Sequence, residues 1–563
     1  MNKRLLLVPV VLAALVVTLS AQAKLDLELL KKPPTDAWPT YHGDYSGRHY
    51  STLTQIDRST VTNLRLEWQY RANLSPEGAM TGGTVEKPVL QFSGQALRGF
   101  LMAAPLMVNG VLYFSAPDHA WAVDARTGHE IWHYFWRSSG GEYMGNRGMA
   151  MYGNWLYFGT PDGHLISLDA KTGRERWHKE IGSVKSNYYV SAAPVVVKDH
   201  LIVGLSGDAL DVPAWIESRN PDTGELEWKW YTTPRAGEPG SDTWPNDFAR
   251  EHGGGMTWQP VTYDPDLNLI YVPIGNPTPM YHPELRKGDN LYSCSLVALN
   301  PDTGKMVWYF QTSPNEAWDF DANQVPVLID TTIDGQPRKV VAQANRNGTY
   351  YLFDRATGEH LVSALLAESV NWTLGFNEKG GPIRNPAKMY QRGGALISPS
   401  NGGIQNWVPP TYMPETGLLY FNAMQGFDIH YTYGDPDPVT GELGHQAQSV
   451  GGYDMSLRAI DVKTGKAKWI HRYAGSEWNP PRPHRVGGLL STAGGVVFAG
   501  NPAGYMVAYE AFTGQILWRA ILPDRGNPVL SNVTNPPITY MLDGRQFLLF
   551  ASDDTLYAYA LPR

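Results

Sequence analysis

An internal repeat constrains the fold of this chain more than any other feature of its sequence. The pattern A-x-D-x-x-T-G-x-x-x-W, with Ser, Asn or Glu replacing the first residues in some copies, ends at Trp132, Trp177, Trp228, Trp308, Trp469 and Trp518. In each copy the Asp or Asn and the Thr can hydrogen-bond the turn backbone, and the Gly supplies a positive φ. We therefore predict strand, turn and strand in every copy, with the tryptophan packed between neighbouring sheets.

The spacing of the repeat predicts a ring of blades. Neighbouring copies lie 45 to 51 residues apart in three places, which suits one four-stranded blade each. A degenerate copy has Val362 in place of the tryptophan, and the 107 residues up to Trp469 have room for two blades. With residues 66–70 opening the first blade and residues 556–559 closing the ring, we predict an all-β, eight-bladed β-propeller with tryptophan-docking motifs. It would form one domain over residues 24–563.

Composition supports this class and excludes one kind of partner. The chain has 57 glycines, 42 prolines, 31 tyrosines and 19 tryptophans, which favours short strands and many tight turns. It carries 46 Lys and Arg against 54 Asp and Glu, a net charge of −8, and no basic run. We therefore predict no nucleic-acid partner.

The N-terminus reads as an export signal. Lys3 and Arg4 precede the apolar run 5–19 and the segment Ser20-Ala21-Gln22-Ala23, so we predict a signal peptide over 1–23, cleaved after Ala23, and a periplasmic protein. The alternative, a membrane anchor, needs a longer apolar run, and we predict no membrane span. Cys294 is the only cysteine, so no C-x-x-C-H haem site exists and electrons would leave through a separate partner.

One acidic stretch, residues 315–324 (NEAWDFDANQ), precedes an apolar segment, 325–329, that reads as a buried strand. If residues 318–321 are extended, Asp319 and Asp321 project from one face and the two aromatic residues from the other. Two adjacent carboxylates repel unless one is protonated or a cation lies between them. The alternative is a solvated loop with two surface aspartates.

With these repeats, the chain resembles the quinoprotein alcohol dehydrogenases, which use pyrroloquinoline quinone (PQQ), from Trp38 to the last blade. Residues 318–320 resemble the family's W-D-[FY] motif, which implies that Asp319 is the base and a metal neighbour. Asp321 resembles the extra aspartate of the lanthanide-dependent members, and a trivalent cation favours more anionic oxygens than calcium. Residues 275–279 (GNPTP) resemble the segment whose asparagine binds the metal, which implies that role for Asn276. Without this context Asn276 would read as an ordinary turn residue.

The resemblance also implies residues that contact the cofactor. Trp258, which belongs to no repeat, matches the tryptophan under the planar quinone, and a flat aromatic side chain suits such stacking. Arg346 matches the arginine beside the reactive carbonyl, where a guanidinium can stabilise negative charge. The remaining expected cofactor contacts are Arg147, Ser191, Ser206 and Asn406. Arg147 has an alternative reading as a solvated turn arginine.

The implied activity is oxidation of a small alcohol or aldehyde. A lanthanide(III) ion or Ca²⁺ at Asn276, Asp319 and Asp321 would act as Lewis acid, Asp319 would accept the hydroxyl proton, Arg346 would stabilise the oxyanion, and PQQ would accept hydride. A c-type cytochrome would then take the electrons. The alternatives are a non-catalytic periplasmic β-propeller scaffold or binding protein, and a carrier of quinone or metal without turnover.

Three departures from the family pattern concern the same site. The family's adjacent cysteines have no counterpart near Gly141-Glu142, so one wall of the cofactor pocket must be built differently. The position of the metal-binding glutamate is Ala209, with Asp208 or Asp211 as candidate replacements. Met102 stands where the family has a glutamate that contacts the cofactor.

Overall fold

The computed structural model describes residues 25–72, 101–141, 145–186, 188–207, 212–436, 443–473, 486–522, 533 and 535–563. The expected signal peptide, Glu142, and the expected metal-site positions Asp208, Ala209 and Asp211 lie outside these residues. Of the described residues, nearly all regular structure is β-strand, and the all-β prediction is confirmed.

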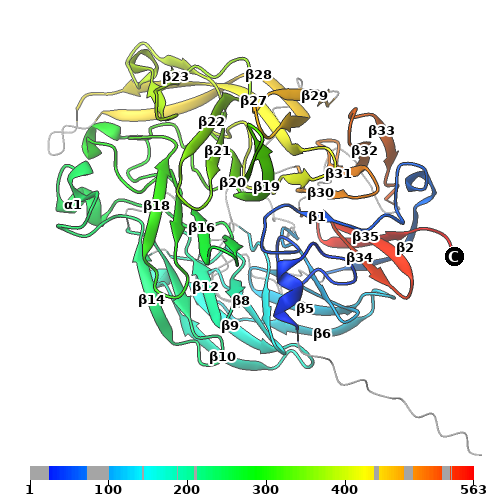
Figure 1. Ribbon diagram of the computed structural model, residues 1–563. Helices are drawn as coiled ribbons and strands as arrows, with labels where there is room; N and C mark the ends of the chain where they lie inside the picture. The colour runs from blue at the N-terminus through cyan, green and yellow to red at the C-terminus, as the bar shows by residue number, and fades with distance from the viewer. Residues whose placement is uncertain are drawn as a thin grey trace, which may run out of the picture.

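The strands form antiparallel sheets that follow one another around a common centre (Figure 1). Five consecutive sheets take their four strands from one continuous segment: β3 (Leu106–Val108), β4 (Val111–Ala116), β5 (His119–Asp124) and β6 (Glu130–Phe135); β7 (Ala150–Tyr152), β8 (Trp155–Gly159), β9 (His164–Asp169) and β10 (Glu175–Glu180); β11 (Val195–Val197), β12 (His200–Gly204), β13 (Trp215–Arg219) and β14 (Leu226–Tyr231); β15 (Thr262–Asp264), β16 (Leu269–Pro273), β17 (Ser295–Leu299) and β18 (Met306–Gln311); β19 (Val327–Ile333), β20 (Gln336–Ala344), β21 (Thr349–Asp354) and β22 (His360–Leu365). Because β19 begins at Val327, the strand expected after the acidic stretch is present.

The remaining described strands form three larger or composite sheets and one hairpin. They are β25 (Ala395–Ile397), β26 (Thr411–Met413), β27 (Leu418–Tyr433), β28 (Gly444–Asp461) and β29 (Ala467–Arg472); β1 (Tyr50–Ser51), β30 (Leu489–Thr492), β31 (Val496–Gly500), β32 (Met506–Glu510) and β33 (Ile516–Arg519); β2 (Arg65–Arg71), β34 (Ile538–Leu542), β35 (Arg545–Ser552) and β36 (Thr555–Ala560); and the hairpin β23 (Thr373–Phe376) with β24 (Pro382–Arg384).

The repeat tryptophans lie where one sheet meets the turn of the next. Gly173, at φ +67°, sits so close to the Trp132 ring that a Cβ on the glycine would lie 2.7 Å from a ring carbon. The indole N–H of Trp132 donates to the Ala170 carbonyl at 3.0 Å, in the same turn. The same pair of contacts recurs at Trp68, Trp177, Trp228, Trp308 and Trp469.

The degenerate copy is explained by a different aromatic residue. Gly465 of the following turn lies against Tyr350 and Ala364 rather than against Val362. The Tyr350 hydroxyl donates to the Val462 carbonyl at 2.7 Å, which is the kind of bond that an indole N–H makes at the other junctions. A tyrosine one strand further in therefore fills the place of the missing tryptophan.

The expectation of two blades between Val362 and Trp469 is wrong. Residues 395–472 form one sheet whose strands β27 and β28 are 16 and 18 residues long. These two strands pair from Leu418 opposite Asp461 to Tyr433 opposite Gly444, so the extra length is a hairpin that extends one sheet rather than a second sheet.

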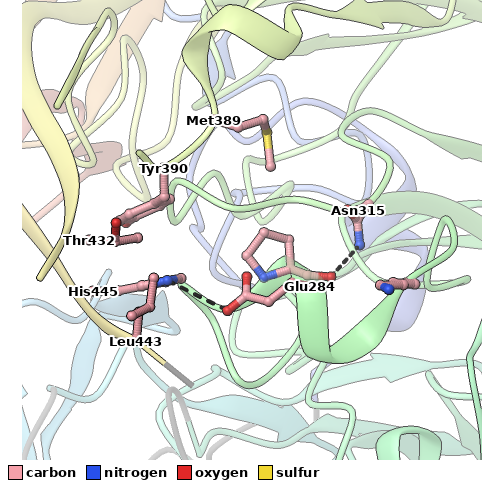
Figure 2. A pocket seen from close by; sticks show the side chains of 9 residues that line it. Glu284, Asn315, Met389, Tyr390, Thr432, Leu443 and His445 are labelled. Atoms are coloured by element: carbon pink, nitrogen blue, oxygen red, sulfur yellow. Dashed lines mark hydrogen bonds and ion pairs between the residues drawn. The ribbon is translucent and has the colours of Figure 1, made fainter. Parts of the chain in front are cut away.

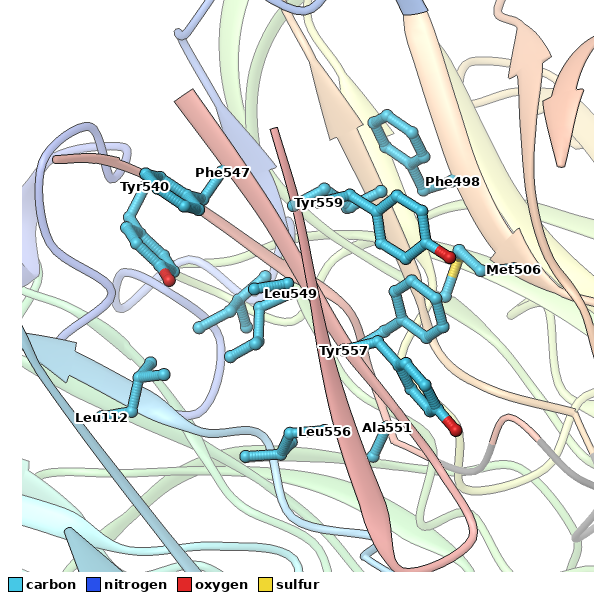
Figure 3. Packing of buried hydrophobic residues seen from close by; sticks show 14 of the residues in the cluster. Leu112, Phe498, Met506, Tyr540, Phe547, Leu549, Ala551, Leu556, Tyr557 and Tyr559 are labelled. Atoms are coloured by element: carbon cyan, nitrogen blue, oxygen red, sulfur yellow. The ribbon is translucent and has the colours of Figure 1, made fainter. Parts of the chain in front are cut away.

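The last sheet combines strands from both parts of the chain. We expected residues 66–70 to open the first blade, but β2 pairs antiparallel with β36, for example Leu66 with Tyr559. Figure 1 shows β2 beside β34 and β35, close to the C-terminus. Figure 3 shows the packing that surrounds this sheet: Leu549 and Tyr559 lie in one buried cluster with Leu112 of β4 and Phe498 of β31.

Helical segments in the described residues are short. They are α1 (Asp247–Glu251) and the 3-10 turns η1 (Leu27–Lys31), η2 (Val61–Asn63), η3 (Val184–Ser186), η4 (Ser241–Thr243), η5 (Pro283–Arg286) and η6 (Pro386–Lys388). Among the residues with assigned structure, no helix has the length and apolar character that a membrane span needs.

Candidate active site

Four of the predicted site residues form one cluster, in which Arg346 and Asn276 both contact the carboxylates of Asp319 and Asp321. Arg346, from the turn between β20 and β21, donates through NH2 to Asp319 Oδ2 at 2.7 Å and through NH1 to Asp321 Oδ2. Asn276, which follows β16, donates its backbone N–H to Asp321 Oδ1 at 2.9 Å and its Nδ2 to Asp319 Oδ1 at 3.2 Å. The carboxylate pair is therefore a buried group bridged by a guanidinium, and the solvated-loop alternative is wrong.

The local backbone differs from the extended segment that we expected. Asp319 has φ +69°, in the left-handed region, and residues 316–323 form no strand. The Glu316 carboxylate holds this bend, because its Oε1 accepts the backbone N–H of Trp318 and, at 3.0 Å, that of Phe320. Trp318 and Phe320 point into the core and pack on Trp372, with ring centroids 5.6 and 5.8 Å away. The aspartates thus reach the same cation by a bend and not by strand periodicity.

The two aspartates differ in exposure. The Asp319 side chain is 18 % exposed, whereas that of Asp321 is 3 % exposed. Burial lowers the pKa of Arg346, but the two carboxylates outweigh it and hold the pKa above its ordinary value, so the guanidinium stays charged. One positive charge facing two carboxylates leaves the group with an excess of negative charge, which favours a further cation.

A second set of predicted residues surrounds Trp258. The Arg147 guanidinium lies 4.5 Å from the centroid of the Trp258 ring and 5.3 Å from that of Trp407. Its NH1 donates to Ser191 Oγ at 2.7 Å, and Ser191 Oγ lies 2.7 Å from Ser206 Oγ. Arg147 is buried, which contradicts its alternative reading as a solvated turn residue.

Asn406 makes local contacts in this structure. Its Nδ2 donates to the Gly402 carbonyl at 2.8 Å, and its Oδ1 accepts the Trp407 backbone N–H at 2.8 Å. The residue therefore fixes the turn that presents the Trp407 ring to Arg147.

One short segment connects the two sets. The Met256 carbonyl accepts the backbone N–H of Gly275 at 2.8 Å and the Asn323 Nδ2 at 3.0 Å. Met256 lies two residues before Trp258, while Gly275 precedes Asn276 and Asn323 follows Asp321. These hydrogen bonds therefore link the position of Trp258 directly to the positions of the two carboxylates.

Buried polar atoms around Trp258 suit a polar planar cofactor. Trp258 Nε1, Gln259 Oε1 and Trp407 Nε1 are buried and have no hydrogen-bond partner among the residues that the structure describes. Such atoms cost free energy unless a ligand or water bonds them. Together with the charged Arg147 and the indole faces, they fit a flat aromatic ligand that carries carboxylates and carbonyls, as PQQ does.

The carboxylate group suits a hard metal ion. Asp319, Asp321 and Asn276 offer only oxygen ligands, which are the donors that Ca²⁺ and other hard cations prefer. The Asn276 amide presents Nδ2 to Asp319, and a half-turn of this amide would place its oxygen there instead. Three protein residues supply fewer than the roughly six to eight oxygens of a calcium site, so further ligands, such as those of a bound cofactor, would complete the shell.

Two residues at this site were not predicted from the sequence. Arg286 is fully buried; its Nε donates to the Pro279 carbonyl at 3.1 Å, its NH1 to Asn290 Oδ1 at 2.9 Å, and its NH2 to the Glu316 carbonyl. It therefore joins the segment that follows Asn276 to the bend that carries Asp319. Burial raises the pKa of Glu316 to about 7 and lowers that of Arg286 to about 10.

Close packing in the structure explains two of the positions at which the sequence differs from the family pattern. Gly141 has φ +115°, and a Cβ there would lie 1.8 Å from the Pro161 carbonyl oxygen, so the backbone leaves no room for a cysteine side chain. The Met102 sulfur occupies the space beside Gly145, 2.4 Å from where a Cβ would lie. Gly141 and Gly145 are therefore closely packed, the first by a backbone carbonyl and the second by a thioether.

Comparisons with known proteins identify the family of this chain. Residues 38–365 and 453–548 match the family model described as PQQ, glucose/ethanol/alcohol dehydrogenase, β-propeller domain. The chain is 32 % identical to quinoprotein alcohol dehydrogenase PedH of Pseudomonas putida, over 98 % of this chain and 92 % of that protein. It is 35 % identical to the quinohemoprotein alcohol dehydrogenase of Comamonas testosteroni, over 92 % of this chain and 72 % of that protein.

Solved structures give the same result. A quinohemoprotein alcohol dehydrogenase from Pseudomonas putida superposes with a TM-score of 0.82 at 29 % identity, over 96 % of this chain and 83 % of that one. A europium-containing methanol dehydrogenase superposes with a TM-score of 0.79 at 26 % identity, over 95 % of this chain and 99 % of that one.

Proposed function

The chain belongs to the family of PQQ-dependent alcohol dehydrogenases, and on this basis we propose that it oxidises an alcohol, with PQQ as the electron acceptor and a bound metal ion as Lewis acid. The observation that carries this proposal is the convergence of Arg346 and Asn276 on the carboxylates of Asp319 and Asp321. A scaffold would gain nothing from burying this charged group, since burial of charges costs free energy.

The roles of the residues follow from their exposure and contacts. Asp319 is the more exposed carboxylate, so it can reach a substrate hydroxyl and accept its proton. Asp321 is nearly inaccessible and fixed by Asn276 and Arg346, so it serves as a metal ligand and holds the guanidinium in place. Arg346 can stabilise negative charge that develops on an oxygen beside it.

Trp258, Arg147, Ser191 and Ser206 would hold the cofactor. The Trp258 ring offers the stacking face, and Arg147 offers charged donors for carboxylates. Bound PQQ would supply the hydride acceptor of the reaction. The buried Trp258 and Trp407 indole N–H groups, which lack hydrogen-bond partners within the described part of the chain, are donors that a polar cofactor could use.

Asn276, Asp319 and Asp321 would hold a lanthanide(III) ion or Ca²⁺. Asp321 provides the additional anionic oxygen that a trivalent ion favours. The structural similarity to the europium-containing methanol dehydrogenase supports the lanthanide alternative.

The proposal also covers the number of blades, the domain boundaries and the location of the protein in the cell. The sheets would be the eight blades of a propeller, closed by β2 on β36 and fastened by the tryptophan contacts, in one domain over 24–563. A cleaved signal peptide over 1–23 would direct the chain to the periplasm. There a separate c-type cytochrome would accept the electrons.

Reconstitution tests the activity. The purified chain is incubated with PQQ and either Ca²⁺ or La³⁺, and alcohol-dependent reduction of an artificial electron acceptor is measured. We expect turnover with at least one metal, and its loss in Asp321→Asn but not in the control Asp199→Asn, whose side chain is 77 % exposed. Absence of PQQ binding with both metals would overturn the proposal in favour of a non-catalytic propeller.

A further inference from the structure

A pocket of about 450 Å³ lies between η5 and the start of β28, and it holds polar groups that the proposed reaction does not use. Figure 2 shows Glu284 of η5 and His445 of β28 next to each other in the lining of this pocket, together with Tyr390, Met389 and Leu443. His282, which directly precedes η5, approaches the same carboxylate.

We propose that His282, Glu284 and His445 bind a divalent transition metal ion of the Zn²⁺ type. Glu284 Oε1 lies 3.3 Å from His282 Nδ1 and 3.5 Å from His445 Nε2. The three ligand atoms all lie within 4.8 Å of one another. Ligand bonds of about 2.0–2.2 Å in a tetrahedron place ligand atoms about 3.3–3.6 Å apart, so two of the three separations already match.

His445 is held in the orientation and tautomer that a metal ligand needs. Its Nδ1 donates to the Tyr281 carbonyl, so the neutral imidazole carries its free lone pair on Nε2, the nitrogen that faces Glu284. A histidine whose second nitrogen is bonded to a carbonyl is the usual arrangement of a metal-binding imidazole. The ring is also confined by stacking between His282 and Tyr390, with centroids 4.1 and 4.7 Å away.

His282 is the ligand that moves when the metal binds. Its ring is nearly parallel to that of His445, at 6°, and a metal ion cannot lie in two parallel ring planes at once. The His282 side chain is 24 % exposed, against 4 % for His445, so His282 can turn out of the stack. Binding therefore replaces a ring stack by two nitrogen–metal bonds.

The position of this site indicates which two segments a bound metal ion would join. Residues 282–284 follow the segment that begins at Asn276, whereas His445 belongs to the long hairpin of β27 and β28. A metal ion would fasten the hairpin to this segment at the edge of the pocket. Three protein ligands leave the fourth tetrahedral position to water or to a small ligand in the pocket.

Co²⁺ is the probe for this site, because a tetrahedral Co²⁺ ion reports its ligands through intense visible absorption. The full chain is treated with chelator, without added PQQ, and titrated with Co²⁺ and then with Zn²⁺. We expect one Co²⁺ per chain with the tetrahedral spectrum, displacement by Zn²⁺, and a higher melting temperature with Zn²⁺.

Variants locate the bound ion. His282→Ala and Glu284→Gln change partly exposed side chains and should each weaken Co²⁺ binding at least about tenfold, since loss of an outer-shell partner alone costs that much. The control His178→Ala removes a histidine that lies 2.7 Å from Glu175 but belongs to no cluster of three metal-binding side chains among the described residues, and it should bind Co²⁺ as the wild type does.

A further variant separates this site from the hard-metal site. Asp321→Asn should leave Co²⁺ binding unchanged, so the result does not depend on the proposed quinone chemistry. The proposal is overturned if the wild type binds no Co²⁺, if the spectrum is not tetrahedral, or if His282→Ala and Glu284→Gln bind the ion as tightly as the wild type.

Discussion

Gly173→Ala should destabilise the protein by about 2–5 kcal/mol. The left-handed backbone at φ +67° costs an alanine about 1–2 kcal/mol. In addition, the new Cβ would lie 2.7 Å from the Trp132 ring, and relieving such an overlap in a packed interior costs about 1–3 kcal/mol. The ring cannot retreat freely, because its indole N–H is bonded to Ala170 in the same turn.

Gly417→Ala is the matched control. Gly417 has the same φ of +67°, its N–H closes the same kind of turn onto Met413 at 3.0 Å, and a Cβ there would meet no atom within 4 Å. Only the backbone cost of about 1–2 kcal/mol applies to this variant. The difference between the two variants therefore isolates the contact between the glycine and the tryptophan ring.

Urea titrations followed by tryptophan fluorescence measure both free energies of unfolding. We expect Gly173→Ala to be less stable than Gly417→Ala by about 1–3 kcal/mol, with unchanged urea dependence for the control. Equal losses in the two variants would refute the idea that the junction between β6 and the β9–β10 turn depends on this close contact.

Three further predictions concern the candidate active site. Asp319→Asn should lower kcat at least about 100-fold in the reconstituted enzyme, and near-normal turnover would exclude Asp319 as the proton acceptor. Arg346→Gln leaves the Asp319 and Asp321 carboxylates without their guanidinium and should lower the free energy of unfolding by about 3–5 kcal/mol. Added Ca²⁺ should restore part of this loss. A loss that is identical with Ca²⁺ and with chelator contradicts a metal ion at this position. Because burial raises the pKa of Glu316 from 4.5 to about 7, the folded protein retains a proton there that the unfolded chain releases, and its stability falls as the pH rises through this range. Glu316→Gln should lack this fall, which amounts to about 2–3 kcal/mol between about pH 5 and about pH 8.5 in denaturation experiments; parallel profiles of variant and wild type would show that Glu316 does not titrate near neutral pH.

The repeat allowed much of the fold to be predicted, because each copy combines a local turn signal with a residue that packs on the next copy. Asp169, Thr172 and Gly173 encode their turn through hydrogen bonds and φ alone, so the sequence is sufficient there. The expectation failed where no repeat residue marks the pairing. Nothing local in residues 65–71 shows that they pair with strand β36, nearly 500 residues away, since such pairing depends on closure of the whole ring.

Some residues of the candidate site could likewise be predicted from the sequence, and others could not. Asp319, Asp321 and Arg346 lie in short motifs, and the structure brings them together as their chemistry suggests. Glu316 and Arg286 carry no such motif, because their roles are bonds to backbone groups whose positions depend on tertiary packing. Their burial, not their residue type, makes them significant.

The pairing of β2 with β36 has a consequence for folding of the chain during its synthesis. Residues 65–71 leave the ribosome nearly 500 residues before their partner strand at 555–560. During synthesis this first strand has an unpaired edge, of the kind that pairs with wrong partners. The nascent chain thus depends on protection of that edge, and premature termination shortly before residue 555 would leave an edge that no later segment covers.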